Sequence, residues 1–266
     1  MFNSKKIKLL LLEIKKINID RIQKKSKSKE IKYSIRNDTI FIDNNLTLSN
    51  SSLTSLPRHM VIDGDLDIRG SKIKKIPRDI IINGNLYLQE TKVKKIPKYT
   101  YIGGNLNLEK TQIKKIGKNV TISGTVYLTS SKIKKLPKNL IIKDSLVIRN
   151  SKLKKLPSNL TIGNTIIFGG SKIKKLPDNL KIKGPLYLDG TNISKIGKNI
   201  TIQEGVSFYK LKIKRLNRNL TIDCFLDLSK TEIKKLPNSL LVNGFIDIRH
   251  TKIKKIPPHI KCKIYR

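Results

Sequence analysis

Apolar residues recur along this chain with a period of 20 residues, from about residue 51 to about residue 260. Two consecutive copies read LPRHMVIDGDLDIRGSKIKK (56–75) and IPRDIIINGNLYLQETKVKK (76–95). Within each copy, apolar and polar residues alternate over the stretch that corresponds to 60–68, which is the periodicity of a strand and not of a helix. Six positions are almost always aliphatic, and their columns begin at Leu53, Leu56, Met60, Ile62, Leu66 and Ile68.

Six apolar columns are buried together only if each copy forms one coil and the coils stack in register. The pattern therefore predicts a mainly β fold, a single elongated solenoid of about ten 20-residue leucine-rich-repeat-like coils with an N-terminal cap helix. Stacked strands lie about 4.8 Å apart. A string of hairpins is the alternative, but it leaves the columns that begin at Leu53 and Leu56 without a buried side.

Three columns indicate where each coil bends. One column holds Gly64, Gly84, Gly104, Gly124, Asp144, Asn164, Gly184 and Gly244, which predicts a sharp bend with a left-handed residue. A Pro-x-Asn pattern, as in Pro157–Asn159, suits a tight turn. A Ser/Thr column beginning at Ser71 and Thr91 places hydroxyls where they can bond neighbouring backbone groups inside the third bend.

The repeat resembles the short leucine-rich repeat of bacterial effector proteins, L-x-L-x-x-N-x-L-x-x-L-P. The matching residues are Leu86, Leu88, Thr91, Val93, Ile96 and Pro97, with Thr or Ser in place of the ladder Asn. The resemblance implies a stacked-coil architecture. It implies no particular activity, because such repeats serve many functions.

The ends of the chain differ from the repeats. We expect an N-terminal cap helix and linker over 1–30, with apolar side chains at helical spacing such as Ile7, Leu10 and Ile14. The alternative for this basic segment is a helix that lies on a membrane surface. Residues 31–266 form the predicted solenoid, with a degenerate first unit at 39–55, regular units at 56–255 and a C-terminal cap at 256–266.

The net charge is extreme, +38 from 57 Lys and Arg against 19 Asp and Glu. Such a charge attracts polyanions. The many Lys, Ile and Asn codons also fit an AT-rich genome, such as that of a giant DNA virus or a low-GC bacterium, so codon drift on solvated positions is a competing explanation. Two cysteines and no apolar run of about 20 residues favour an intracellular protein without a transmembrane segment.

Catalytic and metal chemistry find little support in the sequence. His250, His259 and Cys262 lie near one another in sequence, but structural zinc sites use four ligands in recognisable pairs. No local motif pairs a nucleophile with a base. We therefore expect a non-enzymatic protein without a cofactor or a metal.

Lysines form the strongest polar pattern, the lysine stripe, because they flank buried columns and must point outward. As an alternative to binding a protein partner, the stripe predicts that nucleic acid or another polyanion binds there electrostatically. The competing interpretation is that the stripe is only a solvated face. The stripe consists of Lys74, Lys75, Lys94, Lys95, Lys114, Lys115, Lys134, Lys135, Lys154, Lys155, Lys174, Lys175, Lys234, Lys235, Lys254 and Lys255.

A second candidate surface is the strand face, where the residues that point away from the core differ from copy to copy. Variation within rigid repetition is typical of a protein-binding surface, and tyrosines suit it as anchors. The first expectation is therefore a monomeric interaction scaffold that binds a protein partner through Tyr87, Asn107, Tyr127, Val147, Ile167, Tyr187, Asp227 and Asp247. The irregular unit at 196–215 fits either an exposed local site or one decayed copy.

Overall fold

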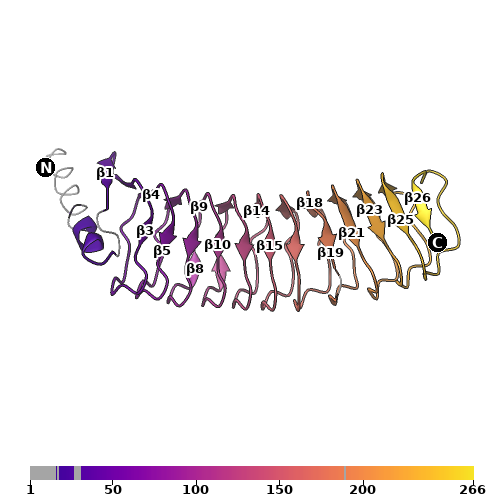
Figure 1. The fold of residues 1–266 in the computed structure, drawn as a ribbon, viewed down its shortest axis with the longest axis horizontal. Coiled ribbons are helices and arrows are strands. Elements are labelled where there is room, and N and C mark those ends of the chain that lie inside the picture. The colour runs from indigo at the N-terminus through magenta and orange to yellow at the C-terminus, as the bar shows by residue number, and fades with distance from the viewer. Residues whose placement is uncertain (1–15, 17, 27–30, 189) are drawn as a thin grey trace, which may run out of the picture. The chain divides into compact units, whose positions relative to one another are not determined.

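The computed structural model describes residues 16, 18–26, 31–188 and 190–266. The fold is mainly β, a parallel β-solenoid of about 11 turns spaced 20 residues apart, with one short helix at 18–23 near the N-terminus. This confirms the predicted fold class. The coils fall into two compact units, Met1–Tyr127 and Leu128–Arg266, and in each unit the strands of successive coils lie side by side (Figure 1).

The first unit begins with an antiparallel hairpin and continues with parallel strands. The hairpin pairs β1 (Tyr33–Arg36) with β2 (Thr39–Ile42). The first strands of the coils then extend the sheet from β2 through β4 (Met60–Ile62), β6 (Ile81–Ile82), β9 (Tyr101–Ile102) and β12 (Thr121–Ile122). The second strands form another sheet of β3 (Leu46–Thr47), β5 (Leu66–Asp67), β7 (Leu86–Tyr87), β10 (Leu106–Asn107) and β13 (Val126–Tyr127).

The second unit repeats this arrangement. Its first strands are β14 (Ile141–Ile142), β16 (Thr161–Ile162), β18 (Lys181–Ile182), β20 (Ile200–Ile202), β22 (Leu220–Ile222) and β24 (Leu241–Val242). Its second strands are β15 (Leu146–Val147), β17 (Ile166–Ile167), β19 (Leu186–Tyr187), β21 (Gly205–Ser207), β23 (Phe225–Asp227), β25 (Phe245–Asp247) and β26 (Lys263–Tyr265). Ile246 pairs with Ile264, so the last coil is two residues shorter than the others.

Each coil has a third side, where lysine-bearing segments stack. In the first unit, β8 (Lys95–Ile96) pairs with β11 (Lys115–Ile116), and in the second unit Lys175 and Lys195 form an isolated bridge. Gly117 stands where most copies have proline, and its backbone N–H donates to the Ile96 carbonyl at 2.9 Å. Proline has no N–H to donate, so this pairing forms where the repeat lacks proline.

The six predicted apolar columns form the core of both units. Ile73, Ile82 and Leu106 in the first unit and Ile162, Leu186 and Ile213 in the second are fully shielded from solvent. At roughly 25 cal/mol per Å² of apolar surface, these stacked aliphatic side chains are the main favourable contribution to folding. The burial confirms the third side, which a string of hairpins would lack.

The prediction of a left-handed bend at the Gly64 column is wrong. The glycines that have positive φ are Gly70, Gly170 and Gly190 among the described residues, and none belongs to that column. The column is glycine because the coils approach closely there. A Cβ built on Gly104 would lie 2.7 Å from the carbonyl carbon of Gly84 and 2.6 Å from the side-chain oxygen of Asn85.

Left-handed residues occur instead at two other corners. One column follows the second strands and includes Asn50, Gly70, Glu90 and Lys110. The other column ends the Pro-x-Asn turn and consists of His59, Asp79, Tyr99, Asn119, Asn139, Asn159, Asn179, Asn199 and Asn219. Asn is the residue other than glycine that adopts this conformation most readily, which explains its frequency there.

Polar side chains form hydrogen bonds with the backbone groups of the bends, both within a coil and between coils. Thr91, Thr111 and Thr231 donate their hydroxyls to the carbonyl three residues earlier, at 2.8, 2.9 and 2.7 Å, as expected for bonding inside the bend. Bonds between coils come from residues that follow the Gly64 column. In each case a side-chain oxygen accepts the backbone N–H of the residue 20 positions later, at 2.6–2.7 Å. The acceptors are Asn45, Asp65, Asn85 and Asn105, and the last donor is Thr125.

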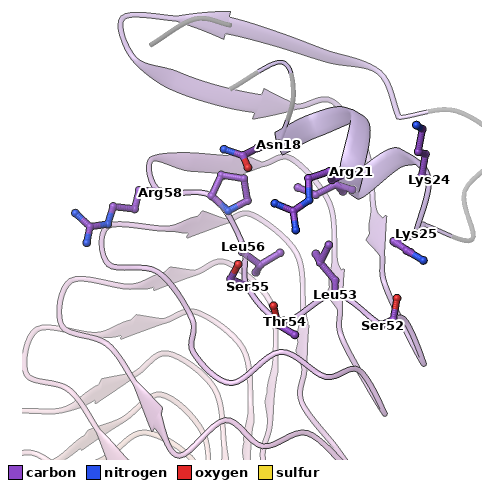
Figure 2. Close-up of a pocket in the computed structure, with 12 residues that line it drawn as sticks. Asn18, Arg21, Lys24, Lys25, Ser52, Leu53, Thr54, Ser55, Leu56 and Arg58 are labelled. Atoms are coloured by element: carbon purple, nitrogen blue, oxygen red, sulfur yellow. The ribbon is translucent and has the colours of Figure 1, made fainter. Parts of the chain in front are cut away.

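The short N-terminal helix contacts the first coils. Ile19 and Ile22 are buried, Ser26 donates its hydroxyl to the Thr47 carbonyl at 3.0 Å, and Ile31 donates its N–H to Gln23 at 2.6 Å. Figure 2 shows the helix lying across the coil that carries Leu53 and Leu56. The predicted apolar positions Ile7, Leu10 and Ile14 lie outside the described residues.

Candidate functional site

All sixteen residues of the lysine stripe are exposed, as their flanking positions predict. Parallel register places equivalent lysines next to one another, and Lys95 is directly paired with Lys115. Two unit charges about 5 Å apart repel by about 0.8 kcal/mol in water, and like charges opposite one another weaken a sheet. The stripe is therefore a row of cations that the fold holds together against their repulsion.

A second basic column, which we call the flanking column, lies beside the stripe and was missed by the sequence interpretation. It follows the proline position by one residue, so the same 20-residue period would have revealed it. Its members are exposed and consist of Arg58, Arg78, Lys98, Lys118, Lys138, Lys198 and Arg218. The lysine stripe and the flanking column together form the basic face of each unit.

Acidic side chains neutralise little of this face. Within the described part of the chain, a member of this face, Lys175, pairs with Asp178 at 3.4 Å, and Lys214, which stands at the repeat position of Lys74, pairs with Glu232 at 4.0 Å. Asp178 also accepts the backbone N–H of Lys198 at 3.1 Å, and this bond, with the Lys175 contact, lowers the pKa of its carboxyl group. Both pairs belong to the second unit, and surface pairs of this kind contribute little stability.

In the first unit the basic face is hollowed into an open groove of about 880 Å³. Ile76 and Pro97 lie in the groove between the stripe and the flanking column, and no acidic residue lines it. Its basic lining consists of Lys74, Lys75, Arg78, Lys92, Lys94, Lys95, Lys98 and Lys114. An anion in this groove would meet cations from several coils at once.

A neighbouring hollow lies between the helix and the coil at 52–58, also in the first unit (Figure 2). Arg21, Lys24 and Lys25 come from the helix and its end, and Arg58 comes from the coil. The backbone of Lys74 donates to the Thr54 carbonyl at 3.3 Å, so this coil is adjacent to one that lines the groove. Basic side chains therefore continue along this side of the first unit.

The strand face differs from its prediction. The expectation that its residues are exposed is wrong for Val147 and Asp247, which are buried at 9 % and 7 % exposure, whereas Tyr187 is 56 % exposed. The remaining members are half-buried and consist of Tyr87, Asn107, Tyr127, Ile167 and Asp227. Stacking in register covers much of each side chain with its neighbours one coil away.

Several polar members of the strand face have a structural role. Asn107, Asp227 and Asp247 accept the backbone N–H two residues later, at 2.8–3.0 Å. Asp247 also binds the Arg249 guanidinium at 2.6 Å, and this pairing lowers the pKa of its carboxyl group. Side chains that hydrogen-bond their own turn in this way are common where the chain bends.

Aromatic side chains gather elsewhere in the second unit, where Phe245 and Tyr265 are exposed and Phe225 is half-buried. Phe225 stacks on Phe245 with ring centroids 5.8 Å apart, and Phe245 meets Tyr265 edge-on at 5.4 Å. In the irregular unit, Tyr209 lies beneath the ammonium groups of Lys210 and Lys230. Hydrogen bonds from these two lysines lower the pKa of the Tyr209 phenol.

Metal binding and membrane spanning each require a recognisable arrangement of residues. Nowhere among the described residues do three His, Cys, Asp or Glu side chains gather as they would around a metal ion. His259 instead contacts the Leu240 carbonyl at 3.0 Å. The described part of the chain contains no helix whose length and hydropathy would let it cross a bilayer.

Comparisons of this chain with known protein families, curated proteins and solved structures find no match.

Proposed function

We propose that the protein binds polyanions electrostatically through its basic face, without sequence readout. The observation that carries the proposal is the in-register stacking of exposed lysines, of which few have an acidic partner among the described residues. Binding a polyanion would neutralise this repulsion and release the counterions condensed on both molecules. The groove in the first unit supports the proposal because its cations converge and its lining contains no carboxylate.

The proposal is tested by measuring affinity for a random-sequence DNA duplex across a range of salt concentrations. In the test variant, Lys74, Lys94, Lys95 and Lys98 are replaced by Gln. In the matched control, the same replacement is made at Lys143, Lys181, Lys183 and Lys261, which are exposed but lie outside the basic face. The two variants carry the same net charge, so that only the location of the lost cations differs.

We expect wild-type affinity to fall steeply as salt rises, with a log–log slope of about −0.9 for each phosphate contacted. The test variant should lose at least about tenfold in affinity at ~50 mM salt and show a shallower slope. The control variant should lose much less. Equal losses in the two variants, or no binding by the wild type at ~50 mM salt, would refute the proposal.

Binding of a protein partner is the second candidate. The leucine-rich-repeat resemblance supports it, because the strand face is the usual binding surface of such repeats. Tyr187 is the member of the predicted face that is most exposed, and the aromatic cluster of Phe225, Phe245 and Tyr265 adds apolar surface in the same unit. Aromatic side chains of this kind commonly anchor protein partners. The buried or internally bonded members of the face favour the polyanion proposal over this one.

A further inference from the structure

Tyr99 departs from its column in a way that the fold does not explain. From His59 to Asn219 every member of its column has positive φ, and the members other than Tyr99 are Asn, Asp or His. Tyr99 has φ of 63°, in a region that costs an ordinary residue about 1–2 kcal/mol. Burial does not offset this cost, because Tyr99 is 59 % exposed.

Asn is the residue that this position normally uses, and the second unit shows why. There the amides of Asn159, Asn179 and Asn199 each donate to the preceding Asn at 3.2, 2.9 and 3.0 Å. A tyrosine forms no such amide ladder and is poorly suited to the backbone. Backbone strain that no contact within the fold offsets occurs often at binding sites.

The backbone places Tyr99 at the edge of the basic groove. Pro97 and Lys98, the two preceding residues, line the groove. The turn is fixed by the Thr100 hydroxyl, which donates to the Pro97 carbonyl at 3.3 Å, and by the Tyr99 N–H, which donates to the Lys118 carbonyl at 3.3 Å. Tyr99, an exposed aromatic residue, thus directly follows two residues of the groove, whose lining contains no aromatic side chain.

We infer that the groove and Tyr99 together bind single-stranded nucleic acid. The groove lysines contact consecutive phosphates, and the Tyr99 ring stacks on one unpaired base. This inference rests on the proposed polyanion binding and specifies its ligand. A duplex keeps its bases stacked on one another, whereas a single strand can turn a base outward, and stacking on an aromatic ring tolerates any base. One aromatic residue beside many cations therefore fits single strands without sequence preference.

The test compares three ligands of equal phosphate number: a single-stranded oligonucleotide, the same strand with abasic sites, and a blunt duplex. Tyr99→Asn restores the residue that the repeat prefers, Tyr99→Phe keeps the ring, and Tyr187→Asn removes an exposed tyrosine from the other unit as a control. Affinity is measured by fluorescence anisotropy at ~100 mM salt, and thermal unfolding shows that each variant folds.

We expect Tyr99→Asn to weaken binding of the normal single strand on the order of tenfold, while its midpoint of unfolding stays the same or rises. Binding of the abasic strand and the duplex should change little. Tyr99→Phe and Tyr187→Asn should bind the single strand like the wild type. The wild type should bind the abasic strand about as weakly as Tyr99→Asn binds the normal strand.

The results separate this inference from the proposal on which it rests. Unchanged single-strand affinity in Tyr99→Asn, with affinity still lost in the groove lysine variant, would overturn the role of Tyr99 and leave polyanion binding intact. If Tyr99→Asn lost affinity equally for the single strand, the abasic strand and the duplex, stacking of Tyr99 on a base would be overturned. Absence of binding to all three ligands at low salt would refute the proposed function itself.

Discussion

At the residue scale, close approach between coils decides which side chains the repeat tolerates. The Gly64 column illustrates this, because its glycines are needed for space and not for positive φ. Where a neighbouring coil carries Asn or Asp after this glycine, the side-chain oxygen occupies the place that a Cβ would need, as Asn85 does beside Gly104. Space and the hydrogen-bond ladder therefore select the same residue.

Two glycine substitutions distinguish the two reasons for having glycine. Gly104→Ala should destabilise the first unit by about 1–3 kcal/mol, because its Cβ would overlap the Gly84 backbone. Gly190 has φ of 67° but open space where a Cβ would lie. Gly190→Asn should therefore be nearly neutral, since Asn tolerates this conformation. Urea unfolding measures both changes, and a neutral Gly104→Ala would contradict the close-approach explanation.

At the scale of the elements, one column at the start of the second strands is stabilised differently in the two units. In the first unit, Asp65, Asn85 and Asn105 accept backbone N–H groups from the next coil. In the second unit, Phe225 and Phe245 occupy the same column and stack. The second strands are only two or three residues long, so these contacts supplement a short set of backbone hydrogen bonds.

Breaking one step of the polar ladder should weaken the first unit. Asn105→Ala removes the oxygen that accepts the Thr125 N–H at 2.7 Å, and an unpaired, partly buried N–H costs about 1–3 kcal/mol. Asn105→Asp retains an acceptor, as Asp65 does in the same column, and serves as the matched control. Urea unfolding should show a loss for the first variant and little change for the second. Equal stability of the two variants would argue against the ladder.

At the scale of the whole molecule, net charge opposes folding. A chain of net charge +38 with lysines stacked in register repels itself, and salt screens this repulsion. The Debye length falls from about 30 Å at 0.01 M to about 8 Å at 0.15 M ionic strength. The charge therefore makes stability depend on the ionic environment.

The midpoint of thermal unfolding should rise by several degrees between ~10 mM and ~150 mM NaCl, because screening relieves repulsion in the folded state more than in the expanded unfolded state. The variant with four groove lysines changed to Gln should show a smaller rise. Differential scanning calorimetry measures both. A midpoint that stays constant or falls with added NaCl would show that repulsion between the lysines does not limit stability.

Much of the fold could be predicted from the sequence, because its main signals are local or exactly periodic in a chain that stacks on itself. The burial of the Ile73 column and the exposure of Lys74 and Lys75 follow from alternation and period alone. The 20-residue period also predicts the flanking column that includes Lys98. The basic residues of the candidate site could thus be located from the sequence, although the sequence interpretation ranked a protein partner first.

The sequence by itself determined the repeat, the six aliphatic columns and the side on which the lysines lie, because these depend on residue spacing within one chain. Only the tertiary structure decided the role of the Gly64 column, the burial of Val147 and Asp247, the groove, and the positive φ and exposure of Tyr99. These features arise when residues 20 apart are brought to a strand spacing of about 4.8 Å. At that distance, the room beside each side chain depends on its neighbour in the next coil, which no single copy of the repeat specifies.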